Sequence, residues 1–193
     1  MTLLGRLGHN PTLSEVAENA AARPPIVTST LNRLGFGART RDRWITGYVN
    51  TPCHRLGDVL NSEGAGEALL AEDVVIGDRR EAAGDTSEYA IVNLSSVLFV
   101  VAVDDSAPPR RDTFAWVKKR REGILVGVGP YEIVGDCHVV DGATLRNPSA
   151  LSKFAFIVIT SAVIRQRGQS GPGEQHGTVF VNRQLVDFMV PAR

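Results

Sequence analysis

The sequence predicts a mainly β protein built from two small β-barrels in tandem, with a short helical arm in front of them. The main reason is a pattern of apolar strands that occurs twice, first from Trp44 to Val101 and again from Glu132 to Val190. A repeat of about 60 residues is typical of a duplicated structural unit. Identical or similar residues recur 88 positions apart at Ile45 and Ile133, Gly47 and Gly135, and Val75 and Val163, and 89 positions apart at Val92-Asn93 and Val181-Asn182, Phe99 and Phe188, and Val101 and Val190.

The repeat divides the chain into four segments. They are an N-terminal arm at 1–40, a first barrel at 41–103, a linker at 104–122 and a second barrel at 123–193. Each copy is close to the size below which a single core is rarely stable alone. We therefore expect the copies to pack against each other or against another subunit.

Composition limits the possible partners and compartments. Lysine plus arginine and aspartate plus glutamate both number 21, so the chain has no overall field that attracts nucleic acid or acidic membranes. It has no apolar run of ~18 residues that would span a bilayer, and its start is too short in apolar residues for a signal peptide. Two cysteines do not form a secreted disulfide framework. These features predict a cytoplasmic protein.

The arm begins with a helix signal. Thr12-Leu13-Ser14-Glu15 has the spacing of a capping box, and the apolar residues after it predict a helix over 13–22. Arg23-Pro24-Pro25 ends this helix, since proline disfavours helical geometry in the residue before it. The stretch from Pro25 to Leu34 fits either another helical turn or two, or an extended strand.

Two short helices suggest a possible helix-turn-helix, but the third helix that such a domain normally needs is missing. A docking arm is the favoured interpretation. The residues that could face DNA phosphates are Thr28, Ser29, Thr30, Asn32 and Arg33.

Within each copy, short apolar runs separated by polar or glycine-rich stretches predict the strands. In the first copy we expect a strand over 43–50, a turn of helix within 52–62, a buried strand over 68–76, an exposed loop over 77–87 and strands within 88–103. In the second copy we expect a hairpin of 124–128 and 132–139, an apolar strand over 154–164, a loop over 165–177 and a closing strand over 178–190.

Each copy resembles the Sm-like and SH3-like small β-barrels. The residues that support this in the first copy are Gly47, Asp58, Asn61, Leu69-Leu70 with Asp73, and the closing stretch from Val92 to Val100. The resemblance implies a five-stranded barrel. In Sm-like proteins the loop Asp, Asn, Arg and Gly positions hold RNA, but the Arg-Gly pair is replaced here by Asn93-Leu94 and Asn182-Arg183. These departures argue against RNA binding more than against the barrel.

The linker suggests an alternative function. Basic residues interleaved with aromatic ones favour single-stranded nucleic acid, because cations contact phosphates and rings stack on bases. A solvated linker anchored by its tryptophan is the favoured interpretation. The residues concerned are Arg110, Arg111, Trp116, Lys118, Lys119, Arg120 and Arg121.

The sequence has no recognisable catalytic motif, and we expect neither an enzyme nor a bound cofactor. Cys53-His54 and Cys137-His138 have zinc-binding residue types. However, adjacent residues on a strand point to opposite faces, so one such pair is poorly arranged to bind a single ion. We expect no metal site.

The favoured function is that of a structural or scaffold protein that forms a homo-oligomer or joins a larger assembly. Barrel strands with few charges leave edges that must be covered or paired. We therefore predict that the two closing strands pair across subunits or with a partner. The predicted interface residues are Val97, Phe99, Val101, Val186, Phe188 and Val190.

Overall fold

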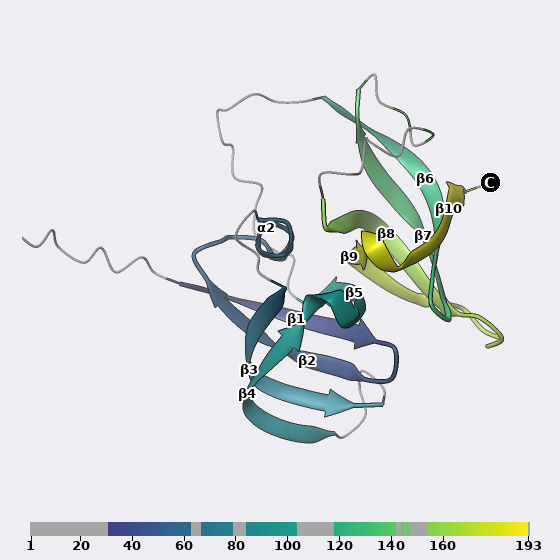
Figure 1. Ribbon diagram of the computed structural model, residues 1–193. Coiled ribbons are helices and arrows are strands. Elements are labelled where there is room, and N and C mark those ends of the chain that lie inside the picture. Colours follow the sequence, from purple (N-terminus) through teal and green to yellow (C-terminus); the bar gives the residue numbers. More distant parts are fainter. Residues whose placement is uncertain are drawn as a thin grey trace, which may run out of the picture. The chain divides into compact units, whose positions relative to one another are not determined.

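The computed structural model describes residues 31–62, 67–78, 84–103, 118–141, 144, 146 and 154–192. This part of the chain forms one antiparallel sheet, which confirms the prediction of a mainly β protein (Figure 1). Its strands are β1 (Asn32–Thr40), β2 (Trp44–Thr51), β3 (Ala68–Gly77), β4 (Asp85–Asn93), β5 (Val97–Ala102), β6 (Lys119–Val128), β7 (Tyr131–Val140), β8 (Phe156–Gln166), β9 (Glu174–Asn182) and β10 (Val186–Pro191). A helix, α2 (Leu56–Leu60), and two 3₁₀ turns, η1 (Leu94–Ser96) and η3 (Arg183–Leu185), complete the described elements.

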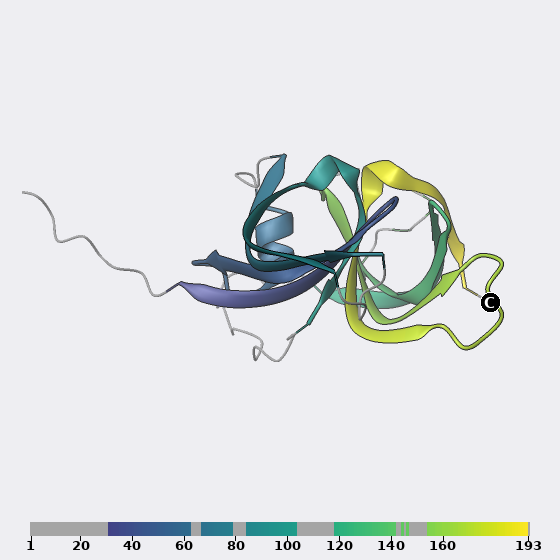
Figure 2. The same ribbon diagram turned by 90° about the horizontal axis from the view of Figure 1, so that it is seen from below.

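The order of strands in the sheet is the same in its two halves. The full order is β10-β6-β7-β8-β9-β5-β1-β2-β3-β4. We call residues 31–103 the N-terminal half and residues 118–192 the C-terminal half. In each half the last strand lies beside the first, and the other three follow in chain order. The strands of each half curve strongly, as Figure 2 shows, but the sheet does not close on itself, and β4 and β10 are its outermost strands.

The elements of the two halves also coincide at the offsets found in the sequence. Adding 89 to the bounds of β4, η1 and β5 gives the bounds of β9, η3 and β10. Adding 88 to the bounds of β1, β2 and β3 gives those of β6, β7 and β8 to within a residue at each end.

Both halves contain the same irregularity between their second and third strands. The register shifts between Thr46 and Tyr48 where β2 pairs with β3, and at the equivalent place where β7 pairs with β8. A side chain at Gly47 would place its Cβ 2.9 Å from the Glu72 carbonyl oxygen. On the opposite strands, Asp73 and Ser161 have φ angles of 49° and 51°, which non-glycine residues rarely adopt. The repeated glycine therefore permits close approach at a β-bulge.

The first strand of the N-terminal half lies in the segment predicted to be an arm. β1 pairs with both β2 and β5, and its Phe36 and Ala38 are buried in the core. Residues 32–34 are therefore extended, the second of the two alternatives for that stretch. The predicted helix over 13–22 and the possible DNA-facing residues 28–30 lie outside the described residues.

Other boundaries are close to expectation. β6 begins at Lys119, inside the segment predicted to be a linker, while β4 begins at Asp85, inside a predicted loop. The helical turn expected within 52–62 is α2. None of the described helices has the length and apolar character needed to cross a membrane.

Two hydrophobic clusters form the core, and each contains residues from both halves. The cluster inside the C-terminal half also includes Trp44, Leu98 and Phe99 from the N-terminal half. The cluster inside the N-terminal half also includes Phe156 and Phe180 from the C-terminal half. The two halves thus share their cores.

Candidate functional site: the internal joint and the outer sheet edges

The two halves are joined by antiparallel pairing of β5 with β9. Phe99 lies opposite Val181, Val100 opposite Phe180, and Val101 opposite Val179. We call this ladder and the side chains around it the internal joint. It joins the closing strand of one half to the fourth strand of the other.

Aromatic packing fills one side of the internal joint. The Phe99 ring lies between Trp44 of the N-terminal half and Tyr131 of the C-terminal half, with ring centroids 5.6 and 5.2 Å apart. Both contacts are edge-to-face, an arrangement that aromatic pairs favour. Phe99 has no exposed surface.

On the other side, Phe180 of β9 packs against α2. It is only 4% exposed, and a Cβ at Gly57 would lie 2.8 Å from its ring. The glycine in this short helix therefore makes room for the phenylalanine.

Asparagine side chains hold the joint by hydrogen bonds to the backbone. Asn182 Nδ2 donates to the carbonyl oxygens of Leu94 and Val97, both at 3.0 Å, and the residue is 4% exposed. Asn61, at the end of α2, donates from Nδ2 to the Phe156 carbonyl at 3.1 Å and accepts from the Phe156 amide at 2.8 Å. Such bonds satisfy polar groups that would otherwise be buried without partners.

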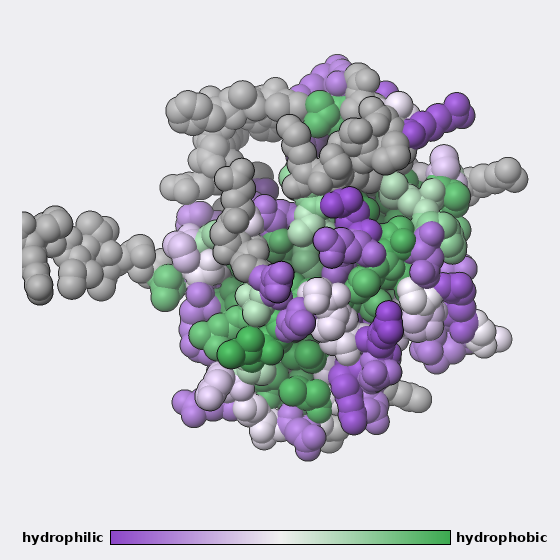
Figure 3. Space-filling model, viewed as in Figure 1, coloured by the Kyte–Doolittle hydropathy of each residue, from purple (hydrophilic) through white to green (hydrophobic). Residues whose placement is uncertain are grey.

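The outer strands expose apolar side chains at positions that are buried in the internal joint. Ile91 of β4 is 72% exposed, whereas the residue 89 positions later, Phe180, is buried. Phe188 and Val190 of β10 are 37% and 44% exposed, and their counterparts Phe99 and Val101 are fully buried. Figure 3 shows hydrophobic residues gathered over the region that Figure 1 labels β3 and β4.

The structure separates the six predicted interface residues into two groups. Val97, Phe99 and Val101 lie in β5, which has β1 on one side and β9 on the other, so this strand is paired within the chain. Phe188 and Val190 are partly exposed on β10, which pairs with β6 alone among the described strands, and Val186 begins that strand.

Sequence reasoning predicted strands within 88–103 but did not identify β4 as an outer strand of the sheet. Tyr89 and Ile91 alternate along it and are exposed. The signal that could have found them is the repeat itself, since Ile91 matches a residue that packs against the other half.

The basic residues of the predicted nucleic-acid surface are only partly described. Lys118 lies 3.9 Å from Asp141, and Arg120 forms an ion pair with Glu122. Lys119 and Arg121 lie in the first part of β6 and are exposed. Arg110, Arg111 and Trp116 lie outside the described residues.

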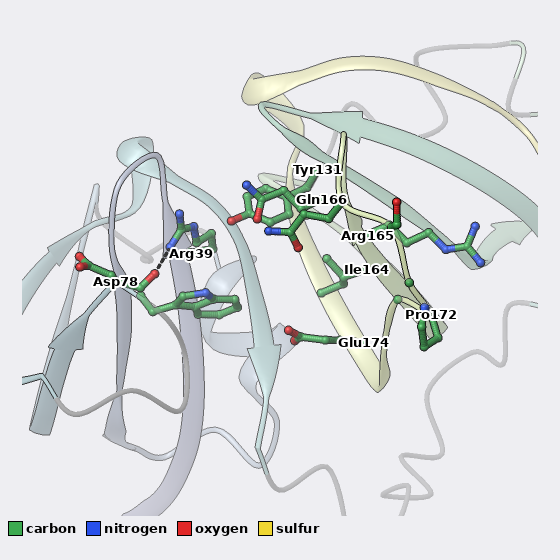
Figure 4. Close-up of a pocket in the computed structure, with 13 residues that line it drawn as sticks. Arg39, Asp78, Tyr131, Ile164, Arg165, Gln166, Pro172 and Glu174 are labelled. Carbon is green, nitrogen blue, oxygen red and sulfur yellow. Dashed lines mark hydrogen bonds between the residues drawn. The ribbon is translucent and has the colours of Figure 1, made fainter.

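A cavity of about 640 Å³ lies at one end of the internal joint (Figure 4). Arg39 donates from Nη1 to the Asp78 carbonyl at 3.0 Å, and its guanidinium carbon lies 5.5 Å from the centroid of Tyr131. Burial raises the pKa of Tyr131, although the neighbouring arginine opposes this rise, so the phenol stays protonated at neutral pH. Glu174 also lines the cavity, which thus presents polar groups of both signs.

The cysteine-histidine pairs do not form a metal centre in the described part of the chain, where no group of three or more His, Cys, Asp or Glu residues could hold an ion. Cys137 is buried in the core of the C-terminal half and hydrogen-bonded strands flank it. Burial is the main cause that raises the pKa of its thiol, and the charge of Glu122 raises it further. Cys53 is half-buried and is also a free thiol.

Comparisons with known proteins give no identification: no protein-family model, curated protein or solved structure matches this chain.

Proposed function

We propose that the chain is a tandem duplication of a small β-barrel of the Sm-like or SH3-like type. We further propose that it acts as a structural, non-enzymatic protein that assembles with other copies of itself through its outer sheet edges. The support for duplication is the coincidence of element bounds and bulges at constant offsets. The support for assembly is that the two outer strands are the counterparts of the two strands that pair in the internal joint.

The two outer strands correspond to the two strands that pair in the internal joint. β10 is the counterpart of β5, and β4 is the counterpart of β9. If β10 of one copy meets β4 of the next, the contact between copies repeats the contact within the chain. The main observation in favour is that Ile91, Phe188 and Val190 are exposed although their counterparts are buried.

The register of the contact between copies follows from the internal joint by the offset of 89. It places Phe188 opposite Val92 of the next copy, Met189 opposite Ile91 and Val190 opposite Ala90. Pro191 comes immediately after these three pairs. Because proline has no amide proton, it ends the ladder at the length seen in the internal joint.

The side chains around Phe188 differ from those around Phe99 in a complementary way. The counterparts of Trp44 and Tyr131 are Glu132 and Arg43. In the contact between copies these two residues, which have opposite charges, would flank Phe188 from neighbouring subunits, and Arg43 also forms an ion pair with Asp78 of its own chain. Complementary charge favours correct pairing over incorrect pairing and speeds association.

A contact between two different edges is head-to-tail. Such a contact gives a closed ring when the rotation that relates successive copies returns to the first copy, and a filament when it does not. A ring pairs every strand edge, which removes the tendency of exposed edges to aggregate. A homo-oligomer with all its barrels arranged alike is therefore the assembly that this sheet favours.

The first experiment is light scattering on the purified full chain, with absorbance at 260 and 280 nm recorded on the same peak. We expect a mass that is a multiple of the 20.8 kDa chain mass and a spectrum free of nucleic acid. A strictly monomeric mass at micromolar concentration would refute the proposal. A peak that contains nucleic acid and loses it at high salt would instead favour the basic segment as a binding site.

A further inference from the structure

Two asparagines at equivalent positions have the same local structure but different surroundings. Asn182 precedes η3 with φ and ψ of −64° and 110°, and Asn93 precedes η1 with −72° and 110°. The Oδ1 atom of each accepts a hydrogen bond from the backbone amide two residues later, at 3.1 Å for Asn182 and 2.9 Å for Asn93. Each side chain is therefore held in the same orientation by its own turn.

The side-chain amide nitrogens of these two asparagines differ in their hydrogen bonds. Asn182 Nδ2 donates across the internal joint to the carbonyls of Leu94 and Val97. Asn93 Nδ2 makes no hydrogen bond within the described part of the chain, and the residue is exposed on the outer strand β4. The turn thus holds a donor group in position at an edge where no described residue accepts its hydrogen bonds.

We propose that Asn93 sets the register of the joint between copies by donating two hydrogen bonds from Nδ2 to the carbonyls of Arg183 and Val186 of the next copy. These carbonyls are the counterparts, 89 positions later, of those that Asn182 binds. The inference rests on the proposed function, because it requires that β4 meets β10.

The acceptors at the other edge have the same arrangement as those of the internal joint. The Val97 amide donates to the Leu94 carbonyl, and the Val186 amide likewise donates to the Arg183 carbonyl. A carbonyl oxygen has two lone pairs, so each can accept a second hydrogen bond. Both ends of β10 are thus defined, by this asparagine at one end and by Pro191 at the other.

This arrangement makes Asn93 a specificity residue rather than a general adhesive. A slip of one residue along an antiparallel ladder turns every side chain to the opposite face. It would also leave the amide of Asn93 buried without acceptors, which is costly. A partner that presents two carbonyls three residues apart beside a 3₁₀ turn satisfies it as the internal joint satisfies Asn182, and β10 of a second copy presents them.

The test compares the full-length chain with Asn93→Asp and with the control Ser95→Ala. Aspartate keeps an oxygen that caps the turn but replaces the donor with a negative charge directed at the carbonyls. Ser95→Ala removes the hydroxyl that bonds to Asn93 at 2.8 Å and leaves the donor intact. We expect Asn93→Asp to raise the dissociation constant of the oligomer at least tenfold and Ser95→Ala to leave it unchanged, with both variants retaining the far-UV spectrum of the parent.

Cysteine cross-linking reports the register itself. In a background with Cys53 and Cys137 replaced by alanine, Ile91→Cys with Met189→Cys is expected to give a disulfide between copies under mild oxidation. Ile91→Cys with Val190→Cys is not expected to form this disulfide, since Val190 points to the opposite face of the sheet from Met189. In the Asn93→Asp background we expect the preference for the first pair to fall.

The outcomes separate this inference from the proposed function. An oligomer whose dissociation constant changes less than tenfold in Asn93→Asp, or whose cross-links favour Val190, refutes the role of Asn93 and leaves the assembly standing. A parent chain that stays monomeric refutes both.

Discussion

Lysine at either outer edge of the sheet is expected to stop assembly, whereas a mixture of the two lysine variants is expected to form a dimer and nothing larger. The variants are Ile91→Lys on β4 and Phe188→Lys on β10. In a head-to-tail contact each variant keeps one functional edge. The intact β10 of the first variant can therefore pair with the intact β4 of the second, and the two blocked edges then prevent further growth.

The expected effect follows from the exposure of Ile91. It is 72% exposed, and its counterpart in the internal joint, Phe180, is 4% exposed, so a contact that buries Ile91 to the same extent would remove about two thirds of its surface from water. Two thirds of the burial energy of such a side chain is about 1–2 kcal/mol. A lysine there forfeits this gain and places an unpaired charge in a buried ladder, which costs several kcal/mol more. The total is at least about 3 kcal/mol, or more than about a hundredfold in the dissociation constant.

Light scattering measures the outcome directly. Each variant alone should have the 20.8 kDa mass of one chain, and an equimolar mixture should have twice that mass. Leu31→Lys is the matched control, because Leu31 is 55% exposed but lies on neither outer strand. A dimer formed by either variant alone would show pairing of like edges. That result, or a mixture that stays monomeric while the parent assembles, would refute the reasoning.

Three further predictions concern the folded chain. Asn182→Ala should lower the free energy of unfolding by about 2–3 kcal/mol in urea, since two buried carbonyls lose their donor; a loss below about 1 kcal/mol would contradict this. Gly135→Ala should lower the free energy of unfolding by about 1–3 kcal/mol, because its Cβ would lie 2.7 Å from the Thr160 carbonyl oxygen. Gly177→Ala is its control, since a Cβ there would have nothing within 4 Å, and it should change this free energy by less than about 0.5 kcal/mol. The thiol of Cys137 has a pKa raised by burial above its ordinary value of 9.0, so its contribution to stability is complete below pH 9 and is lost as the pH rises through the folded-state pKa. Unfolding in urea between pH 7 and pH 10 should show this decline, and Cys137→Ala should reduce it.

The repeat was visible in the sequence at positions where the local structure accepts only one or a few residue types. Gly47 and Gly135 recur because the bulge leaves no room for a Cβ. Asn93 and Asn182 recur because both cap the same turn before the closing strand. Surface positions carry no such constraint, and the two copies differ there.

The first strand was harder to predict, although its apolar residues alternate. Leu34, Phe36 and Ala38 are interleaved with glycine and arginine, which lower the strand signal and resemble a loop. The counterpart β6 has Ile124 and Val126 at the positions that match Phe36 and Ala38, with Glu122 in place of Leu34, and this strand was predicted in part. The offset of 88, which aligns this segment with β6, adds to that alternation as evidence for a strand over 32–40.

The position of the proposed interface could not be derived from strand composition, because both closing strands are mainly apolar, with Asp187 of β10 their single charged residue. Which of them remains at an edge depends on which half docks onto the other. The chain places β9 beside β5, so the closing strand of the N-terminal half is covered and β4 becomes an edge instead. Only the order of strands in the sheet distinguishes these positions.

The differences between the two copies affect the relative strength of the internal joint and of the proposed joint between chains. The internal joint has the aromatic trio of Phe99 with Trp44 and Tyr131, while the outer edges have Glu132 and Arg43 in the flanking places. Exposed ion pairs contribute less than aromatic burial. The internal joint also forms within a single chain, where its two strands are always at high effective concentration. We therefore expect the proposed joint between copies to be the weaker of the two, so that protein concentration would control how far assembly proceeds.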